Sequence, residues 1–221
     1  MNDSNDPEFG QVPAVITTSK VVTTVYDRIL QAIQNGTLLP GQHISDGEIA
    51  EQFGVSRTPV REAIQRLREI GLIEASSGRF TRVVDVTPEQ TEHAYIVWRA
   101  LYAVLINEVI PDAPARAFNV MMRDNASFLA AVPTRDAREL ARTNLDFFSR
   151  LPPESSNVAL QRAINSVVHI LSIGGQHLPT FIDLQALIQA QELLLQAVRD
   201  HDLVVARQAM VVLGEIEIPV A

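Results

Sequence analysis

Residues 54–64, with the sequence GVSRTPVREAI, constrain the fold of this chain more than any other stretch. Gly54 permits the left-handed backbone conformation that ends a helix, and Ser56 is a typical N-cap residue for the next one. On that next helix Arg57 and Arg61 are four residues apart, so their guanidinium groups share one face. The opposite face carries Val60, Ile64 and Leu67. The pattern predicts a helix with one face in a core and the other available to a partner.

The segments before this helix predict two further helices. Apolar residues at positions 25, 29 and 33 are four apart, and the pattern stops at Asn35-Gly36, a typical helix end. Ser45 and Glu48 have the spacing of a capping box, in which both side chains bind free amides at a helix start. A short second helix is therefore expected over 46–53, directly before the turn at Gly54.

The segment after the third helix predicts a β-hairpin. Gly71 ends the helix, and two short strand-like runs at 72–75 and 80–84 flank a turn that contains Gly78. Three helices followed by a hairpin are typical of a winged helix-turn-helix, whose third helix enters a DNA groove. We assign residues 20–84 to this domain and residues 1–19, which lack periodicity, to a flexible tail.

The rest of the chain, residues 85–221, predicts an all-α antiparallel bundle of about six helices with short loops. It begins with Thr87-Pro88-Glu89-Gln90, in which Thr is the cap, Pro the first helical residue and Gln the capping-box partner. Helical patterns separated by Pro and Gly follow over 87–109, 114–132, 135–151, 156–173, 178–201 and 202–215. The fold class is therefore mostly α.

Composition narrows the functional classes. The chain has 221 residues, 47% of them hydrophobic, and no cysteine, which excludes disulfides, thiolate metal sites and a catalytic thiol. The net charge of −8 is divided as −3 over 1–19, +1 over 20–84 and −6 over 85–221, so any DNA-binding surface is local. The N-terminus lacks a signal-peptide pattern, and no uncharged apolar stretch approaches the roughly 18 residues of a membrane span. We expect a cytoplasmic protein.

Several segments in order and spacing resemble the GntR family of bacterial transcription regulators, in the subgroup with an all-helical FCD effector domain. They are Leu39-Pro40-Gly41, Glu48-Ile49-Ala50, residues 55–63 (VSRTPVREA) and Gly71-Leu72-Ile73. The resemblance covers 20–84 strongly and the bundle weakly. It implies that a homodimer binds a palindromic operator in double-stranded DNA. Its implied DNA contacts are Ser56, Arg57, Thr58, Arg61, Arg66, Gly78 and Arg79. A solvated face, with Arg61 paired to Glu62, Gln65 or Glu69, is the alternative.

Many FCD domains bind a divalent metal through one Asp and three His, and this chain departs from that pattern. The four matching positions carry Asn144, Phe148, Gln191 and Leu213. Phe and Leu have no lone pairs for a cation, so we predict no metal and no other cofactor. A shift of one helical turn would instead bring Asp146 or His169 inward. Otherwise we expect His169 at the edge of the core with a hydrogen-bonded ring.

A bundle with these replacements predicts an apolar cavity with a few amide groups, suited to a small organic effector. The candidate effector-binding residues are Tyr95, Arg99, Asn144, Phe148 and Gln191. Arg99 matches an Arg that is common in the family, and two roles stay open: pairing with an effector carboxylate, or a salt bridge within the bundle. Trp98 and Tyr102, on the same predicted helix, belong either to the cavity wall or to the core.

These observations favour a ligand-responsive DNA-binding regulator, with repression as the expected action and no membrane partner. An enzyme is a second class, but the chain has no Gly-x-Ser-x-Gly, His-Glu-x-x-His or phosphate-loop motif. A third class is a helical interaction module whose winged domain binds protein and which takes no effector. Sequence-selective DNA binding would separate the first class from the third.

Overall fold

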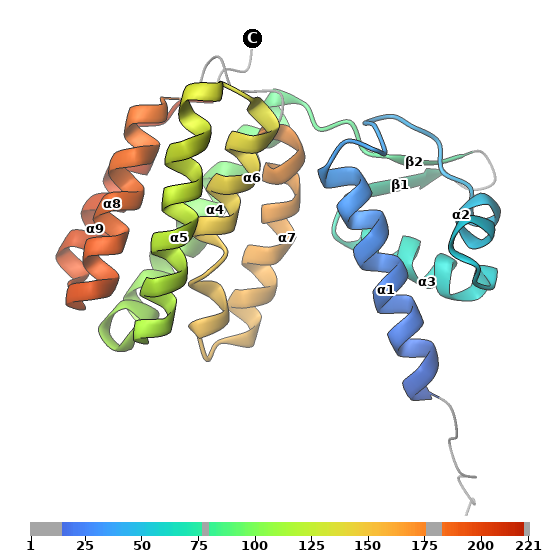
Figure 1. Cartoon of the computed structure of the whole chain (residues 1–221), viewed down its shortest axis with the longest axis horizontal. Helices are drawn as coiled ribbons and strands as arrows, with labels where there is room; N and C mark the ends of the chain where they lie inside the picture. Colours follow the sequence, from blue (N-terminus) through green and yellow to red (C-terminus); the bar gives the residue numbers. More distant parts are fainter. Residues whose placement is uncertain (1–14, 77–79, 176–182, 219–221) are drawn as a thin grey trace, which may run out of the picture.

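The computed structural model describes residues 15–76, 80–175 and 183–218, which form an N-terminal unit beside a helical bundle (Figure 1). The N-terminal unit contains α1 (Val15–Gln34), α2 (Asp46–Phe53) and α3 (Arg57–Glu69), followed by β1 (Ile73–Ser76) and β2 (Phe80–Val83). The predicted winged helix-turn-helix order is confirmed. α1 starts five residues before the expected domain boundary, since no Gly or Pro interrupts the chain between Pro13 and Gly36.

The two strands form an antiparallel hairpin in which Ile73 is paired with Val83 and Ser76 with Phe80. Ile73 and Val83 are buried, so the start of the hairpin is anchored in the core of the N-terminal unit. That core is completed by the apolar faces of the three helices. Its buried members include Val25, Ile29, Val60, Ala63, Leu67 and Leu72.

The bundle contains six helices among the described residues, and its alignment of long helices side by side is visible in Figure 1. They are α4 (Pro88–Val109), α5 (Ala115–Ala131), α6 (Ala137–Phe148), α7 (Val158–Gly174), α8 (Leu184–Asp200) and α9 (Leu203–Gly214). Short 3-10 turns link the first four of them. Each predicted helix is present, most of them with trimmed ends. The predicted start of α8 at 178 lies outside the described residues.

Helix α4 begins with the predicted reciprocal cap: Gln90 N donates to Thr87 Oγ1 at 3.2 Å, and Thr87 N donates to Gln90 Oε1 at 3.0 Å. By length and composition α4 is apolar enough to cross a membrane. It is also the central helix of the bundle, packed against α7 and α9 with Trp98, Tyr102 and Leu105 buried. Core helices of helical proteins share this composition, and burial within the bundle accounts for the part of it on the inner face of α4.

Helix α7 connects the two units. Its Ile173 is buried within the core of the N-terminal unit, and Ile170 packs against the same cluster. A second contact comes from α6, where the guanidinium of Arg138 lies against Gly36 at the end of α1. A Cβ atom added to Gly36 would lie 2.7 Å from Nη1 of Arg138. The backbone φ of Gly36, 74°, also favours glycine.

Candidate functional site

The first candidate site is the exposed face of α3, which the turn after α2 holds in place. Gly54 has a φ of 65°, in the left-handed region, and its amide N–H donates to the carbonyls of Ala50 and Glu51, so α2 ends there and the chain reverses. Ser45 Oγ accepts a hydrogen bond from Glu48 N at 3.4 Å. The predicted return bond from the Ser45 amide to the Glu48 carboxylate is absent among the described residues, and the Glu48 side chain is exposed to solvent.

Arg57 and Arg61 both lie on this face and are both exposed, as the four-residue spacing predicts. Val60, Ile64 and Leu67 are buried on the opposite face. Arg61 Nε donates to Asp46 Oδ2 of α2 at 2.5 Å, while two thirds (67%) of the Arg61 side chain stays exposed. The hydrogen bond from Arg61, with the charges of Arg61 and Arg57, holds the pKa of Asp46 below its usual range.

The partner of Arg61 is none of the three residues that the sequence suggested for it, which are Glu62, Gln65 and Glu69. Those residues lie on α3 itself, whereas Asp46 is on α2, 15 residues away along the chain, and is brought close by the helix-turn-helix. The carboxylate aligns Arg61 without covering it. Two cations therefore face solvent at the start of α3.

The other predicted DNA contacts divide into three groups. Thr58 and Arg66 are exposed on α3. Ser56 is the N-cap residue, but its side chain makes no cap hydrogen bond, so the hydroxyl is not used by the helix. Gly78 and Arg79, at the tip of the wing, lie outside the described residues.

The second candidate site is a cavity of about 90 Å³ inside the bundle. Three of the four positions where the family pattern would have metal ligands line it: Asn144, Phe148 and Leu213. The fourth, Gln191, is fully buried and its Nε2 donates to Asn144 Oδ1 at 2.9 Å. The structure thus brings together residues that are up to 69 positions apart, and most of the other lining side chains are Leu, Ile, Ala and aromatic residues.

Sequence reasoning missed one member of this site. Asn125 of α5 is buried, and its Nδ2 donates to Gln191 Oε1 at 3.0 Å. The signal was present, because Asn125 lies on the same helix face as Met121 and Phe128, both fully buried. A polar residue within an apolar stripe indicates a buried hydrogen bond.

The aromatic residues of α4 have different positions. Tyr95 and Trp98 line the cavity, while Tyr102 is fully buried beside it and donates to the carbonyl of Phe148 at 3.1 Å. Tyr95 Oη donates to the carbonyl of Leu213 at 2.7 Å. Burial raises the pKa of both tyrosines, so both hydroxyls stay protonated as donors.

Arg99 makes a contact that differs from the two roles left open by the sequence. Its Nη1 donates to the carbonyl of Gly214 at 3.1 Å, and its guanidinium lies over the Tyr95 ring. It is absent from the described lining of the cavity. Arg99 therefore binds the C-terminal end of α9, where free carbonyls and the helix dipole favour a cation.

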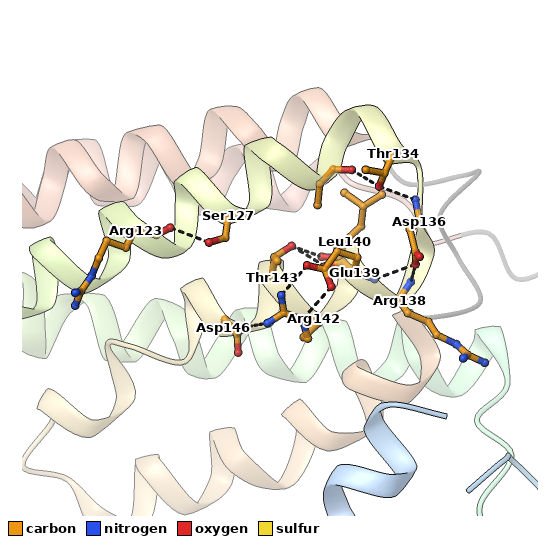
Figure 2. Close-up of polar contacts among 11 residues, drawn as sticks. Arg123, Ser127, Thr134, Asp136, Arg138, Glu139, Leu140, Arg142, Thr143 and Asp146 are labelled. Atoms are coloured by element: carbon orange, nitrogen blue, oxygen red, sulfur yellow. Dashed lines mark hydrogen bonds and ion pairs between the residues drawn. The ribbon is translucent and has the colours of Figure 1, made fainter. Parts of the chain in front are cut away.

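Asp146 and His169 do not reach the bundle cavity. Both line a separate cavity of about 440 Å³ between α1, α6 and α7. Figure 2 shows Arg142 of α6 held between Glu139 and Asp146, with Nη1 2.8 Å from Asp146 Oδ2. The prediction that the His169 ring is hydrogen-bonded is wrong for Nδ1, because this buried atom has no partner among the described residues. No group of three His, Asp or Glu side chains within described segments is arranged to hold a metal.

Comparison with known proteins agrees with this architecture. The model of the bacterial regulatory proteins of the gntR family matches residues 22–83. A regulator of the helix-turn-helix type from Agrobacterium vitis, in the TAR-I ttuE-ttuC' intergenic region, is 33% identical over 52% of this chain and 68% of its own. A probable D-xylose utilization operon transcriptional repressor from Paenarthrobacter nicotinovorans is 29% identical over 74% of each chain.

The fold is also found among solved structures. McbR/YncC of E. coli superposes with a TM-score of 0.71 over 88% of this chain and 94% of its own, at 20% sequence identity. This similarity concerns the fold alone. The matching family model, the relatives and the paired cations on α3 lead to one conclusion: the chain belongs to the GntR family of bacterial regulatory proteins, and it is a DNA-binding transcriptional regulator rather than an enzyme.

Proposed function

We propose that α3 lies in the major groove of an operator, with Arg57 and Arg61 contacting bases or phosphates. The observation that carries this proposal is the exposure of both guanidinium groups on the face opposite the buried Val60 and Leu67. A guanidinium donates two parallel hydrogen bonds to guanine, a pairing worth about 1–3 kcal/mol of base discrimination. Ser56, Thr58 and Arg66 are suited to phosphate contacts that set the register.

We also propose that two copies bind a palindromic operator. Several apolar side chains of α4 and α9 are exposed although these helices pack together in the bundle: Ile96, Val97, Val104, Val204 and Val211. Val97 and Val104 are seven residues apart on α4, as are Val204 and Val211 on α9, so each pair follows one helix face. This α4–α9 face is the surface that a second copy would cover.

The bundle cavity supplies a place for a small organic effector, acting in the cytoplasm. Helix α7 lines the cavity through Leu171, as does its C-cap residue Gly175, and it enters the N-terminal core through Ile173. An effector that binds one arrangement of α7 better than another would shift DNA affinity by that difference. Repression relieved by the effector is the action we propose, and the name of the Paenarthrobacter relative supports it.

Sedimentation equilibrium tests the dimer. The double variant Val104→Glu plus Val211→Glu should be monomeric and should bind the operator more weakly, because charge on the α4–α9 face opposes apolar packing. Val158→Glu is the matched control, since Val158 is equally exposed but lies on α7. A wild-type protein that sediments as a monomer, with or without operator DNA, contradicts the proposed dimer.

A further inference from the structure

The part of the bundle cavity that the described residues line has polar groups but no charged ones. Its described lining includes Thr91, Tyr95, Trp98 and Asn144, and it contains no Lys, Arg, His, Asp or Glu. An isolated carboxylate that entered this cavity would lose its hydration without gaining a cation, which is strongly unfavourable. Arg99, the cation that the sequence suggested for an effector, binds the end of α9. The lining therefore disfavours a charged ligand.

Two of the polar groups have already used their protons. Thr91 Oγ1 donates to the carbonyl of Thr87 at 2.9 Å, and Tyr95 Oη donates to the carbonyl of Leu213 at 2.7 Å. Each of these contacts lies within the wall of the cavity. Neither hydroxyl has a proton left for a ligand.

The Trp98 indole does have an N–H proton that no described residue accepts. Trp98 is 3% exposed and lines the cavity, and its buried Nε1 has no acceptor among the residues that the structure describes. Buried donors in proteins are nearly always paired, because an unpaired N–H loses its hydrogen bond to water without replacement. The rings of Tyr95, Tyr102 and Phe148 surround the indole and hold it in one orientation.

The Asn144 amide presents a second donor. Asn125 donates to Gln191 Oε1, and Gln191 donates to Asn144 Oδ1. The side-chain oxygens of Gln191 and Asn144 therefore both accept a hydrogen bond from the preceding amide. This chain of bonds fixes Asn144 with its oxygen toward Gln191. The Nδ2 group of Asn144 makes no hydrogen bond to a described residue and is left for the cavity.

We propose that the cavity binds an uncharged, mainly apolar molecule with a carbonyl oxygen, such as a ketone, lactone or ester. The oxygen accepts a hydrogen bond from Trp98 Nε1–H or Asn144 Nδ2–H, and the apolar part contacts the leucines and aromatic rings of the lining. The volume of about 90 Å³ is below the roughly 150 Å³ of an apolar cavity that binds benzene. The part that enters is therefore a small ring or a short branched chain. This inference rests on the proposed effector function and names the ligand class.

The single tryptophan of the chain makes a direct test possible, because a ¹⁵N-labelled protein has one indole N–H resonance. Three probes of similar size are titrated at neutral pH: cyclopentanone, methylenecyclopentane, which lacks the acceptor, and cyclopentanecarboxylate, which is charged. Cyclopentanone should shift the indole proton downfield to saturation and bind about tenfold more tightly than methylenecyclopentane. A ketone that leaves the indole resonance unchanged, or a carboxylate that binds as tightly as the ketone, overturns the proposal.

Variants separate the hydrogen bond from general packing. Trp98→Phe keeps an aromatic ring but removes the donor, so the preference for cyclopentanone over methylenecyclopentane should disappear in ligand-detected NMR. Tyr102→Phe removes a buried hydroxyl that donates to the carbonyl of Phe148. Tyr102 is not among the described residues that line the cavity, so this variant should retain the preference. Equal loss in both variants assigns the effect to packing and contradicts the role of the indole.

DNA binding measured in the same samples distinguishes this inference from the proposed function. An unchanged operator affinity at saturating cyclopentanone contradicts the effector role while leaving the ligand class supported. Conversely, an operator affinity that responds to cyclopentanecarboxylate without any indole shift supports an effector response and overturns the ligand class.

Discussion

Leu171 and Ile173 are two residues apart on α7, yet Leu171 lines the bundle cavity and Ile173 is buried in the core of the winged domain. Residues two positions apart on an α-helix point to nearly opposite faces, so one rigid element contacts both compartments. A displacement of α7 at the cavity must therefore move side chains within the DNA-binding domain. This relationship gives the two domains a direct mechanical connection.

Truncating Ile173 tests that connection. Ile173→Ala should lower the free energy of unfolding by about 2–4 kcal/mol, because a buried side chain is lost and a cavity remains between the domains. Chemical denaturation followed by circular dichroism measures the change. Val158→Ala, at an exposed position of α7, is the control and should differ from wild type by less than about 0.5 kcal/mol. Equal stability of both variants would show that Ile173 does not join the two domains.

Gly174 marks the closest approach of α4 and α7. A Cβ atom at this position would lie 2.0 Å from Thr91 Oγ1, so Gly174→Ala must push the helices apart. We expect a loss of about 1–3 kcal/mol in unfolding free energy. In Gly175→Ala the added atom would meet Ala141 Cβ at 3.4 Å, an ordinary contact, and the melting temperature should stay near that of wild type. A Gly174 variant as stable as the Gly175 variant is inconsistent with this packing.

The local signals of the sequence were sufficient for the N-terminal fold. The α2 bounds of 46–53, the stop at Gly54 and the hairpin after Gly71 follow from caps, glycines and apolar spacing, which act within a few residues. The apolar pattern at 25, 29 and 33 did not define where α1 starts, because helix starts without a capping residue carry little signal.

Burial of His169 should give the stability a specific pH dependence. Its desolvation lowers its pKa in the folded protein, so the unfolded chain binds more protons as the pH falls through the unfolded-state value of about 6.5. The free energy of unfolding should therefore decrease between pH 7 and pH 5, and His169→Gln should remove part of that decrease. Denaturant titrations at both pH values measure it. The interpretation fails if the variant and wild type lose equal stability over this interval.

Asp46 should restrain DNA binding while aligning Arg61. Asp46→Asn removes a negative charge beside two DNA-facing cations, so affinity for any duplex should rise several-fold and selectivity for the operator should fall. Stability should change by less than about 1 kcal/mol, since the ion pair is largely exposed. Fluorescence anisotropy with operator and scrambled duplexes measures both effects. Asp112→Asn, at an exposed bundle position, controls for net charge. Weaker binding by Asp46→Asn than by this control would contradict the assignment.

The site was less predictable than the fold. Asn144, Phe148 and Leu213 were correctly placed together because the family pattern supplied long-range information that spacing along one chain lacks. Arg61 contacts Asp46, and Arg99 contacts Gly214. Both contacts depend on how separate helices pack, which local patterns do not encode. Asn125 was missed for the same reason, although its position on an apolar stripe was a usable signal.

The most direct test measures binding to duplex DNA from upstream of the gene that encodes this protein, as a function of salt. Wild type should bind this DNA selectively, with an affinity that falls as salt rises. Arg57→Ala plus Arg61→Ala should weaken binding by about 100-fold and reduce the slope of log K against log salt by about two. The charge-matched control is Arg123→Ala plus Arg162→Ala, exposed arginines of α5 and α7, which should bind like wild type. Unaltered operator binding by the Arg57 and Arg61 variant, folded as judged by circular dichroism, would contradict the account.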